Sequence, residues 1–587
     1  MNKIIFSLKK HNNEHYSDAF IFGGIIGAII FIAIYGVNVL RFTNINWLMH
    51  SDELEGLWDL TQHYMGWVFY RDTPWRFPLG LTEGLTAEPI SVAYTDSIPL
   101  FALIFKILSP VLPSTFQYFG LFELITYILM GGFGALITRY YTNNILYNLG
   151  SAALFTLSPA LLKRVFYHSA LSGHFVILIA FCLWIYKNNY ASIKKHIAHW
   201  TLLIVIATLI NPYYSPMVAG IMMLSILSDL ISSRFSLVSV KKAIVATVIP
   251  AFFTAIAGYV IGLFYGSVSS TATGLDKLSA NINSLFNSMD YELRIPSALN
   301  FQFNKKNYSA FLSGLPYGID WQEEGFAYLG LGMILLLAIV LILFVYKVTS
   351  KKISLLTSPS TVIPIAVGFI VFSLLAFGPI AYVNSHKLYE LNLPAFIFNL
   401  LSTFRSEGRF IWPVHFGVMS LLLIGLIKLL PNNKNAIVIL SLIIVLQIGD
   451  LSPALIAKHN TYAKIPYNNS EEFDNFILTD PIWEKLASSK DEIVIYPPAE
   501  DTICLTPSIS CSLSIYAKKN DMKLNATYCS RPIHEAADRY AYECIKNRRS
   551  NKNDDRIIYV FMNPDSLSEV EDLGLTFYEA DGLAIGY

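Results

Sequence analysis

The chain alternates between long apolar runs and shorter polar stretches, and ends in a longer polar region. A helix rises about 1.5 Å per residue, so about 20 apolar residues are enough to cross the hydrocarbon core of a membrane. The sequence contains eleven such runs, and we therefore expect eleven membrane crossings. The runs lie near residues 20–42, 116–138, 144–162, 170–187, 198–212, 214–231, 243–265, 326–346, 360–382, 411–430 and 435–452.

The distribution of lysine and arginine predicts the orientation of these helices, because short cytoplasmic loops are enriched in both residues. The first run is too long, and too deep behind its polar leader, for a cleaved signal peptide, so we expect it to be retained. Alternate loops are basic, and we expect them to be cytoplasmic. They carry Lys3, Lys9 and Lys10; Arg139; Lys187, Lys194 and Lys195; Arg234, Lys241 and Lys242; Lys347, Lys351 and Lys352; and Lys434.

This orientation requires that the apolar stretch 97–112 does not cross the membrane fully. Lys106 interrupts the stretch, and Pro99, Pro110 and Pro113 bound it, so we expect an interfacial or re-entrant segment. Eleven crossings from a cytoplasmic N-terminus then place the C-terminal region outside the cytoplasm, together with the long loops 43–95 and 266–325.

Composition and charge agree with a membrane protein. Apolar residues make up 54% of the chain and charged residues 14%, against about 25% charged residues in soluble domains. Lysine plus arginine equals aspartate plus glutamate at 42 each, which removes the basic surface that nucleic-acid binding requires. We therefore predict an α-helical polytopic membrane protein whose partners include membrane lipids and no nucleic acid.

Residues 456–587 have the composition of a soluble domain, which follows a membrane domain of residues 1–455. The charged stretch 471–486 predicts a helix, and the apolar segments 492–496 and 556–562 predict strands, so we expect a small α/β domain. Its four cysteines lack the C-x-x-C spacing of zinc sites and predict two disulfides in an oxidising compartment. Three pairings are open, and short loops favour Cys504 with Cys511 and Cys529 with Cys544.

The first outer loop combines acidic and aromatic residues directly after a membrane helix. Asp52, Glu55 and Asp59 are three and four positions apart, so they share one side of a helix. Sugar sites commonly combine polar groups that bind hydroxyls with an aromatic ring that stacks on the sugar. An amphipathic interfacial helix with a hydrated acidic face explains the same pattern without a site. The same loop contains Gln62, His63, Tyr64 and Trp67.

Polar residues also occur at the predicted outer ends of other helices. Each alone is ordinary as a helix cap or interface anchor, but together they favour a shared outer cavity. Lys163 and Arg164 are either snorkelling side chains at a helix end or part of an anion site. Glu123, the one carboxylate deep in an apolar run, is either functional or a hydrogen-bond acceptor for a neighbouring helix. The other members are Asp96, His168, His174, Tyr213, Glu324, Arg405 and Arg409.

Several short motifs occur in a distinctive order. They are Asp59-x-x-Gln-His63-Tyr-x-Gly-Trp67, Arg71-x-x-Pro-Trp75, Thr95-Asp-Ser-Ile-Pro99, Gln117-Tyr-Phe-Gly120, Glu324-Gly-Phe326 and Gly408-Arg-Phe-x-Trp-Pro413. This order resembles a family of bacterial multispan proteins that looks related to the GT-C glycosyltransferases. The resemblance covers roughly residues 20–430 and extends to the C-terminal domain much less clearly.

The resemblance implies a GT-C-like enzyme of the bacterial inner membrane that takes a sugar from a polyprenyl-phosphate donor at the periplasmic face. In such enzymes an acidic residue of the first outer loop is catalytic. Asp59 fits that position best, Asp52 is the reserve, and Asp96 would be the second acidic group. The loop has no D-x-D pair, which leaves open whether a divalent metal assists. We expect the acceptor to be a lipid-linked surface polysaccharide such as the O-antigen of lipopolysaccharide.

The chemistry of such a transfer sets the roles of the candidate residues. An anomeric phosphate is a good leaving group, so the protein must mainly deprotonate the acceptor hydroxyl, position it and stabilise the departing charge. Burial would raise the pKa of an aspartate toward that of a useful base, and arginine suits a phosphate because its planar fork meets two oxygens. His168 and His174 are six positions apart and would lie on different helix faces, which argues against a two-histidine metal site. We predict Lys163, Arg164, Arg405 and Arg409 as donor phosphate-binding residues, and Gln62, His63, Trp67, His168, His174, Tyr213 and Glu324 as sugar- or acceptor-binding residues.

Two other functions fit the same sequence. One is a transporter or flippase of a lipid-linked saccharide, although such folds often contain paired halves and the sequence shows no internal repeat. The other is a non-catalytic membrane scaffold with an outer binding domain. The scaffold predicts that Asp59→Asn leaves function intact, whereas the enzyme predicts a loss of turnover.

Overall fold

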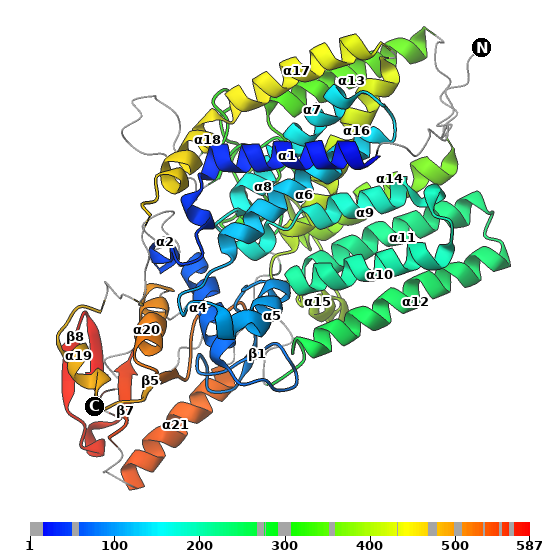
Figure 1. The fold of residues 1–587 in the computed structure, drawn as a ribbon. Coiled ribbons are helices and arrows are strands. Elements are labelled where there is room, and N and C mark those ends of the chain that lie inside the picture. The colour runs from blue at the N-terminus through cyan, green and yellow to red at the C-terminus, as the bar shows by residue number, and fades with distance from the viewer. Residues whose placement is uncertain are drawn as a thin grey trace.

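The computed structural model is mostly helical, with a small sheet at its C-terminal end (Figure 1). The helices pack into a bundle, and the C-terminal sheet lies at one end of it. The structure describes residues 16–49, 58–266, 275, 277–290, 307–350, 358–430, 432–467, 473, 478–497, 507–531, 534–550, 555–562, 567 and 569–587.

Within these residues, nine helices are long and apolar enough to cross a membrane, or ten if one bent pair counts as a single span. The chain therefore has the architecture of a multi-pass membrane protein. The bent pair consists of α17 (Asn433–Asp450) and a second helix made of α18 (Ser452–Lys458) and η7 (His459–Ala463), and the two meet at 60°. The nine are α1 (Tyr16–Tyr35), α6 (Phe119–Arg139), α7 with α8 (Ile145–Arg164), α10 (Ile193–Ile210), α11 (Tyr214–Ser232), α12 (Leu237–Val260), α13 (Leu331–Thr349), α14 (Pro359–Phe377) and η6 with α16 (Glu407–Leu429).

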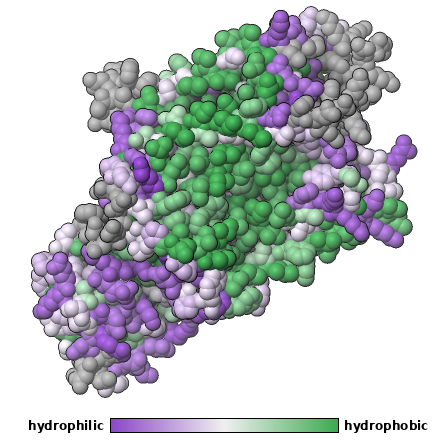
Figure 2. All heavy atoms as spheres, in the orientation of Figure 1, coloured by the Kyte–Doolittle hydropathy of each residue, from purple (hydrophilic) through white to green (hydrophobic). Residues whose placement is uncertain are grey.

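Apolar side chains cover the middle of the molecule in a broad band, and polar residues gather on two opposite sides of it (Figure 2). The polar region at the lower left is the C-terminal domain. Such a band is expected of helices whose outer faces lie against lipid.

Each of the eleven expected runs coincides with a helix, but several boundaries differ. The first ends at Tyr35 because Gly36 turns the chain with φ +72°, and α13 begins only after Gly330, at φ +85°. The run 170–187 forms η3 (Ser169–Leu171) and α9 (Phe175–Ile185), which are shorter than a full span. The stretch 97–112 contains α5 (Pro99–Leu108), whose ten residues rise about 15 Å and do not cross a membrane alone.

Short elements connect the bundle to the C-terminal domain. Figure 1 shows α4 (Asp59–Asp72), α5 and β1 (Leu81–Thr82) between the two. The residues of α4 from Leu60 to Tyr70 are all buried, so the helix is enclosed on nearly every side. The remaining short elements are η1 (Asn38–Leu40), α2 (Asn46–Met49), β2 (Ile90–Ser91), η2 (Ser109–Val111), η4 (Lys187–Asn189), η5 (Gln322–Gly325), β3 (Ile380–Val383), β4 (His386–Glu390), α15 (Ala395–Leu401) and η7 (His459–Ala463).

The C-terminal domain is an α/β unit with a five-stranded sheet in the order β6-β5-β7-β9-β8. Strand β5 is parallel to β6 and β7, and β9 is antiparallel to β7 and β8. The two strands predicted from the sequence are confirmed as β5 (Glu492–Tyr496) and β7 (Ile557–Phe561). The predicted helix 471–486 is helical only from residue 482, in α19 (Ile482–Ala487), because the described residues 473 and 478–481 are not in a helix. The other elements are α20 (Pro507–Lys519), β6 (Lys523–Leu524), α21 (His534–Ser550), η9 (Glu571–Leu573), β8 (Phe577–Ala580) and β9 (Leu583–Gly586).

The predicted disulfide between Cys529 and Cys544 is not formed. Cys529 is a buried thiol whose Sγ donates to the carbonyl oxygen of Arg531 at 2.8 Å. Cys544 lies ten residues along α21, about 15 Å from the start of that helix, so a short connecting sequence does not bring the two sulfurs together. Cys504, the expected partner of Cys511, lies outside the described residues.

Glycines allow α1 and α6 to pack with their backbones in contact. A Cβ atom added at Gly27 would lie 2.0 Å from the carbonyl oxygen of Tyr127, and one added at Gly23 would lie 2.5 Å from that of Gly131. Close backbone approach through small residues is a common basis of helix association in membranes.

We expect Gly27→Ala to separate α1 from α6 and to destabilise the protein by about 1–3 kcal/mol, as overpacking of a close contact does. The readout is the apparent Tm of the detergent-purified protein. Ile29→Leu is the control, since Ile29 is 56% exposed on the same helix. Equal Tm values for both variants would contradict the importance of this contact.

Candidate functional site

A cavity of about 1530 Å³ lies where the helix bundle meets the C-terminal domain. Its wall combines the ends of α10 and α11, the segment around Asp96, the segment 403–409 and one loop of the C-terminal domain. The cavity therefore brings together parts of the chain that are far apart in the sequence, as the polar residues at predicted helix ends suggested. The polar or ionisable side chains in its wall include Asp59, Gln62, Asp96, His168, Asn211, Tyr213, Glu324, Arg405, Arg409, Tyr528 and Arg531.

Asp59 is the first residue of α4, and its carboxylate faces the cavity. Oδ1 lies 3.4 Å from Nε2 of His168 and accepts a hydrogen bond of 3.3 Å from the hydroxyl of Tyr528. Burial alone would raise the pKa of Asp59, but His168 and then His63 outweigh it and lower the pKa below the ordinary value. Asp59 is therefore an ionised carboxylate, and the expectation that burial makes it a stronger base is wrong.

Asp96 has the opposite electrostatic environment. Burial raises its pKa above the ordinary value despite the nearby His168 and Arg409, and repulsion from Asp59 adds to the rise. Its Oδ1 accepts a hydrogen bond of 3.0 Å from the amide of Asn211. The backbone of Asp96 has φ +51°, a left-handed conformation that is uncommon for residues other than glycine and that clusters at functional sites. Two nearby carboxylates whose pKa values are pushed apart are typical of acid–base chemistry.

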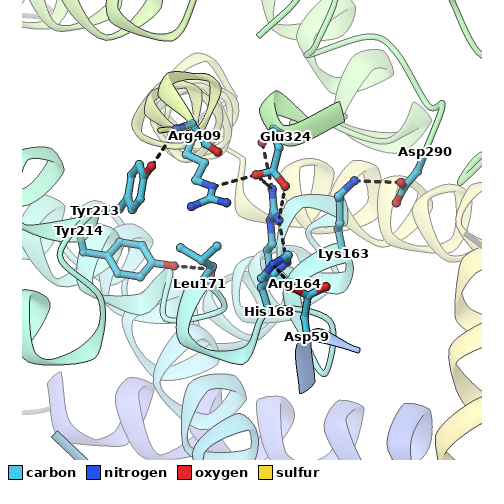
Figure 3. A network of polar contacts seen from close by, with 11 residues as sticks. Asp59, Lys163, Arg164, His168, Leu171, Tyr213, Tyr214, Asp290, Glu324 and Arg409 are labelled. Carbon is cyan, nitrogen blue, oxygen red and sulfur yellow. Dashed lines mark hydrogen bonds and ion pairs between the residues drawn. The ribbon is translucent and has the colours of Figure 1, made fainter. Parts of the chain in front are cut away.

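Glu324 of η5 links two arginines from separate helices (Figure 3). Its carboxylate accepts hydrogen bonds from Arg164 at 2.9 and 3.3 Å and from Nε of Arg409 at 2.8 Å. Although burial alone would raise the pKa of Glu324, the two arginines hold it well below its ordinary value. Arg164 in turn approaches Nδ1 of His168 at 3.4 Å, so the network continues to Asp59.

The four predicted phosphate-binding residues occupy different places. Arg405 and Arg409 line the cavity, whereas the cavity wall as described does not include Lys163 or Arg164. The Nζ of Lys163 forms a buried ion pair with Asp290 at 2.9 Å, and Arg164 is held by Glu324. The structure thus gives Lys163 and Arg164 a role in holding the site together.

The predicted sugar- or acceptor-binding residues are also divided. Gln62, His168, Tyr213 and Glu324 line the cavity. The Trp67 indole is buried among aromatic rings and donates to the carbonyl oxygen of Phe116 at 2.8 Å, so it does not stack on a ligand. His174 is buried against Trp412.

His63 lies behind the cavity wall, with its ring centroid 5.9 Å from that of His168. Burial and the nearby His168 lower the pKa of His63 to about 3, so its imidazole is neutral. Asp52, the reserve for the catalytic position, lies outside the described residues. Glu123 is buried in α6 and accepts a hydrogen bond of 2.6 Å from Ser172, at a place that the described cavity wall does not include.

Several cavity residues were not predicted as site residues, among them Trp58, Tyr528 and Arg531. Trp58 precedes Asp59 and could have been found from its place in the acidic and aromatic loop. Tyr528 and Arg531 come from the C-terminal domain, and no motif in the sequence marks them. The carboxylate of Asp59 and then burial raise the pKa of Tyr528, so its hydroxyl keeps the proton that it donates to Asp59.

The cavity also has an apolar arm between α11 and α12. Thr247 and Gly258 of α12 both line it, and their separation along the helix is about 16 Å. Met223 on α11 is 45% exposed, and Ala251 and Ala255 on α12 are also exposed. The arm is therefore open toward the outside of the bundle at the level of the spanning helices.

No group of three or more histidine, cysteine, aspartate or glutamate side chains within the described ranges is arranged to hold a metal ion. The described cavity thus consists of carboxylates, guanidinium groups, one imidazole and hydroxyls at one end, and of small and apolar side chains along its arm. Such a cavity can bind an amphipathic molecule with a polar, anionic head.

Comparison with known proteins places the chain in one family. Residues 24–452 match a family described as "Domain of unknown function (DUF6311)", and residues 482–587 match one described as "DUF6311 C-terminal domain". No curated protein and no solved structure matches the chain.

We expect Glu324→Gln to lower the free energy of unfolding by about 3–5 kcal/mol, because it leaves two buried guanidinium groups without their shared carboxylate. The measurement is the thermal midpoint of the purified protein at neutral pH. Glu390→Gln is the matched control, since Glu390 pairs with Lys387 on an exposed hairpin, where water screens the pair and its loss should change the midpoint little. A Glu324→Gln midpoint no lower than that of the control would show that the network is not required for the fold.

Proposed function

We propose a function that is based on the site itself, because this chain belongs to the DUF6311 family and the description of that family names no activity. The protein is a membrane glycosyltransferase that takes a sugar from a polyprenyl-phosphate carrier and transfers it to a hydroxyl of a polysaccharide acceptor. The resemblance of its motifs to GT-C enzymes supports the same proposal.

The observation that carries the proposal is the shape and chemistry of one cavity. A cluster of Asp59, Asp96 and His168 opens into the apolar arm between α11 and α12. A polyprenyl-phosphate sugar has the matching form, since a polar, reactive head is joined to a long apolar chain. The binding of a soluble substrate would not require an apolar arm that opens toward lipid.

The two carboxylates suit a single displacement at the anomeric carbon. The acceptor oxygen attacks C1 of the sugar, its proton passes to Asp96, and the bond from C1 to the phosphate oxygen breaks so that the carrier phosphate leaves with the electron pair. Asp96 is the better base because its pKa is raised. Asp59 stays ionised beside His168 and stabilises positive charge that develops on the sugar ring.

The distribution of lysine and arginine supports a location in a bacterial inner membrane with the cavity and the C-terminal domain on the periplasmic side. Donor sugars on polyprenyl phosphate and growing surface polysaccharides such as O-antigen are both lipid-linked, so both substrates reach such a site through the membrane.

We expect the purified protein in nanodiscs to consume a polyprenyl-phosphate hexose when a suitable lipid-linked glycan is present. Asp96→Asn and Asp59→Asn should each lower kcat/KM about a hundredfold or more, the range of a lost general base for Asp96 and of a lost electrostatic stabiliser for Asp59. The assay follows transfer of radiolabelled sugar from the donor lipid to the glycan.

Asp229→Asn is the control for this assay. Asp229 pairs with Lys187 near the other end of α11, outside the described cavity wall, so its turnover should equal that of the wild type. If the wild type moved the lipid-linked sugar between leaflets without transferring it, the protein would be a flippase and the proposal would fail.

The pH dependence of turnover tests the role of Asp96. Because a base acts only when ionised and burial raises the pKa of Asp96, kcat/KM should rise with pH through a midpoint above about 3.9, the ordinary value for aspartate. An acid limb at the ordinary value, or the same limb in Asp96→Asn, would assign the base to another residue.

A further inference from the structure

The cations near the cavity differ in whether a carboxylate already holds them. Arg164 and Arg409 share Glu324, and Lys163 is paired with Asp290. Arg405 also lines the cavity, and among the residues that the structure describes it has neither a hydrogen-bond nor an ion-pair partner. A partly buried guanidinium without a counter-ion gains free energy when it binds an anion.

The C-terminal domain adds a second arginine to the same wall. A terminal guanidinium nitrogen of Arg531 donates to the carbonyl oxygen of Thr403, two residues before Arg405. Both arginines line the cavity. The membrane domain provides Arg405 and the C-terminal domain provides Arg531, which contacts the segment 403–405 at Thr403.

Hydrogen bonds across the domain boundary hold the loop that carries Arg531. The backbone nitrogen of Leu524 donates to Gly84 and that of Ser530 to Tyr94, each at 2.8 Å. The side chain of Asn525 bonds both backbone groups of Ile495 in β5, at 2.8 and 3.1 Å. The loop is thus fixed both to the sheet of its own domain and to the segment just before Asp96.

A further polar group in the cavity points to a ligand. Gln62 is 5% exposed and lines the wall, and its amide nitrogen has no hydrogen-bond partner in the described part of the chain. Buried donors are normally satisfied, so a ligand oxygen is the natural partner for this nitrogen.

We infer that Arg405 and Arg531 together form a binding site for a phosphate group, and that the C-terminal domain is in this way a component of the substrate site. The site deepens the proposed function, on which it rests for the identity of its ligand as a lipid phosphate. Two guanidinium forks can bind separate oxygens of one phosphate, and the apolar arm of the same cavity accepts the chain attached to it.

The test is a binding titration that needs no turnover. Isothermal titration calorimetry compares farnesyl phosphate, inorganic phosphate and farnesol on the full-length protein in detergent micelles. The wild type should bind farnesyl phosphate more tightly than farnesol. Arg405→Gln and Arg531→Gln should each weaken that binding roughly tenfold to a hundredfold, the effect of a lost hydrogen bond to a charged group.

Arg549→Gln is the matched control in the C-terminal domain, because Arg549 pairs with Asp572 on its surface, and it should bind as the wild type does. Arg531→Lys should fall between the wild type and Arg531→Gln, since it keeps the charge but loses the planar fork. Thermal midpoints of all variants establish that they are folded.

Unchanged binding in folded Arg405→Gln and Arg531→Gln would overturn the site, as would equal binding of farnesol and farnesyl phosphate or no phosphate binding by the wild type. Equal, arginine-dependent binding of inorganic and farnesyl phosphate would support the phosphate site and identify its ligand as free phosphate. Sugar transfer is measured on the same preparations so that the two proposals can fail separately. If the wild type transfers sugar and the arginine variants bind farnesyl phosphate as the wild type does, the phosphate site is overturned but the proposed function is not.

Discussion

The carboxylate of Glu324 between the guanidinium groups of Arg164 and Arg409 is the interaction on which the site depends. The three residues belong to α8, η5 and η6, which are far apart in the sequence. Charges removed from water are tolerated only when they are paired and hydrogen-bonded, so this contact fixes how the three segments meet. The trio has one net positive charge, and Asp59 and Asp96 lie on the cavity side of it. His168, which Arg164 approaches, is the main group that lowers the pKa of Asp59 and so keeps its carboxylate ionised, whereas Glu324 acts in the opposite sense.

Much of the fold follows from the lengths of the apolar runs, since each run coincides with a helix. The sequence could not give the helix ends, because these depend on single residues such as Gly36 and Gly330, whose positive φ values end or begin a helix. It also did not reveal the close packing of α1 on α6. Gly23 and Gly27 are four residues apart on one helix face, but their partner Gly131 is far away in the sequence.

The site was predicted in outline and not in detail, and the reasons are physical. Asp59, Asp96, His168, Glu324 and Arg409 meet because all lie at the same ends of helices, which hydropathy indicates. The sequence did not distinguish Trp67 from Gln62, because α4 is buried on nearly all sides and has no single apolar face to orient it. Backbone hydrogen bonds between the domains hold Tyr528 and Arg531 at the cavity. Backbone contacts do not depend on the side chains, so they leave no pattern in the sequence.

Under the proposed function, the opening between α11 and α12 is the route by which a lipid-linked ligand would arrive. A molecule that enters through this gap never leaves the bilayer, so its encounter with the protein is a search in two dimensions. The occupancy of the site then depends on the mole fraction of the ligand in one leaflet and is insensitive to the aqueous volume. Dilution of such a ligand into detergent micelles would therefore reduce its occupancy even when the protein itself is unchanged.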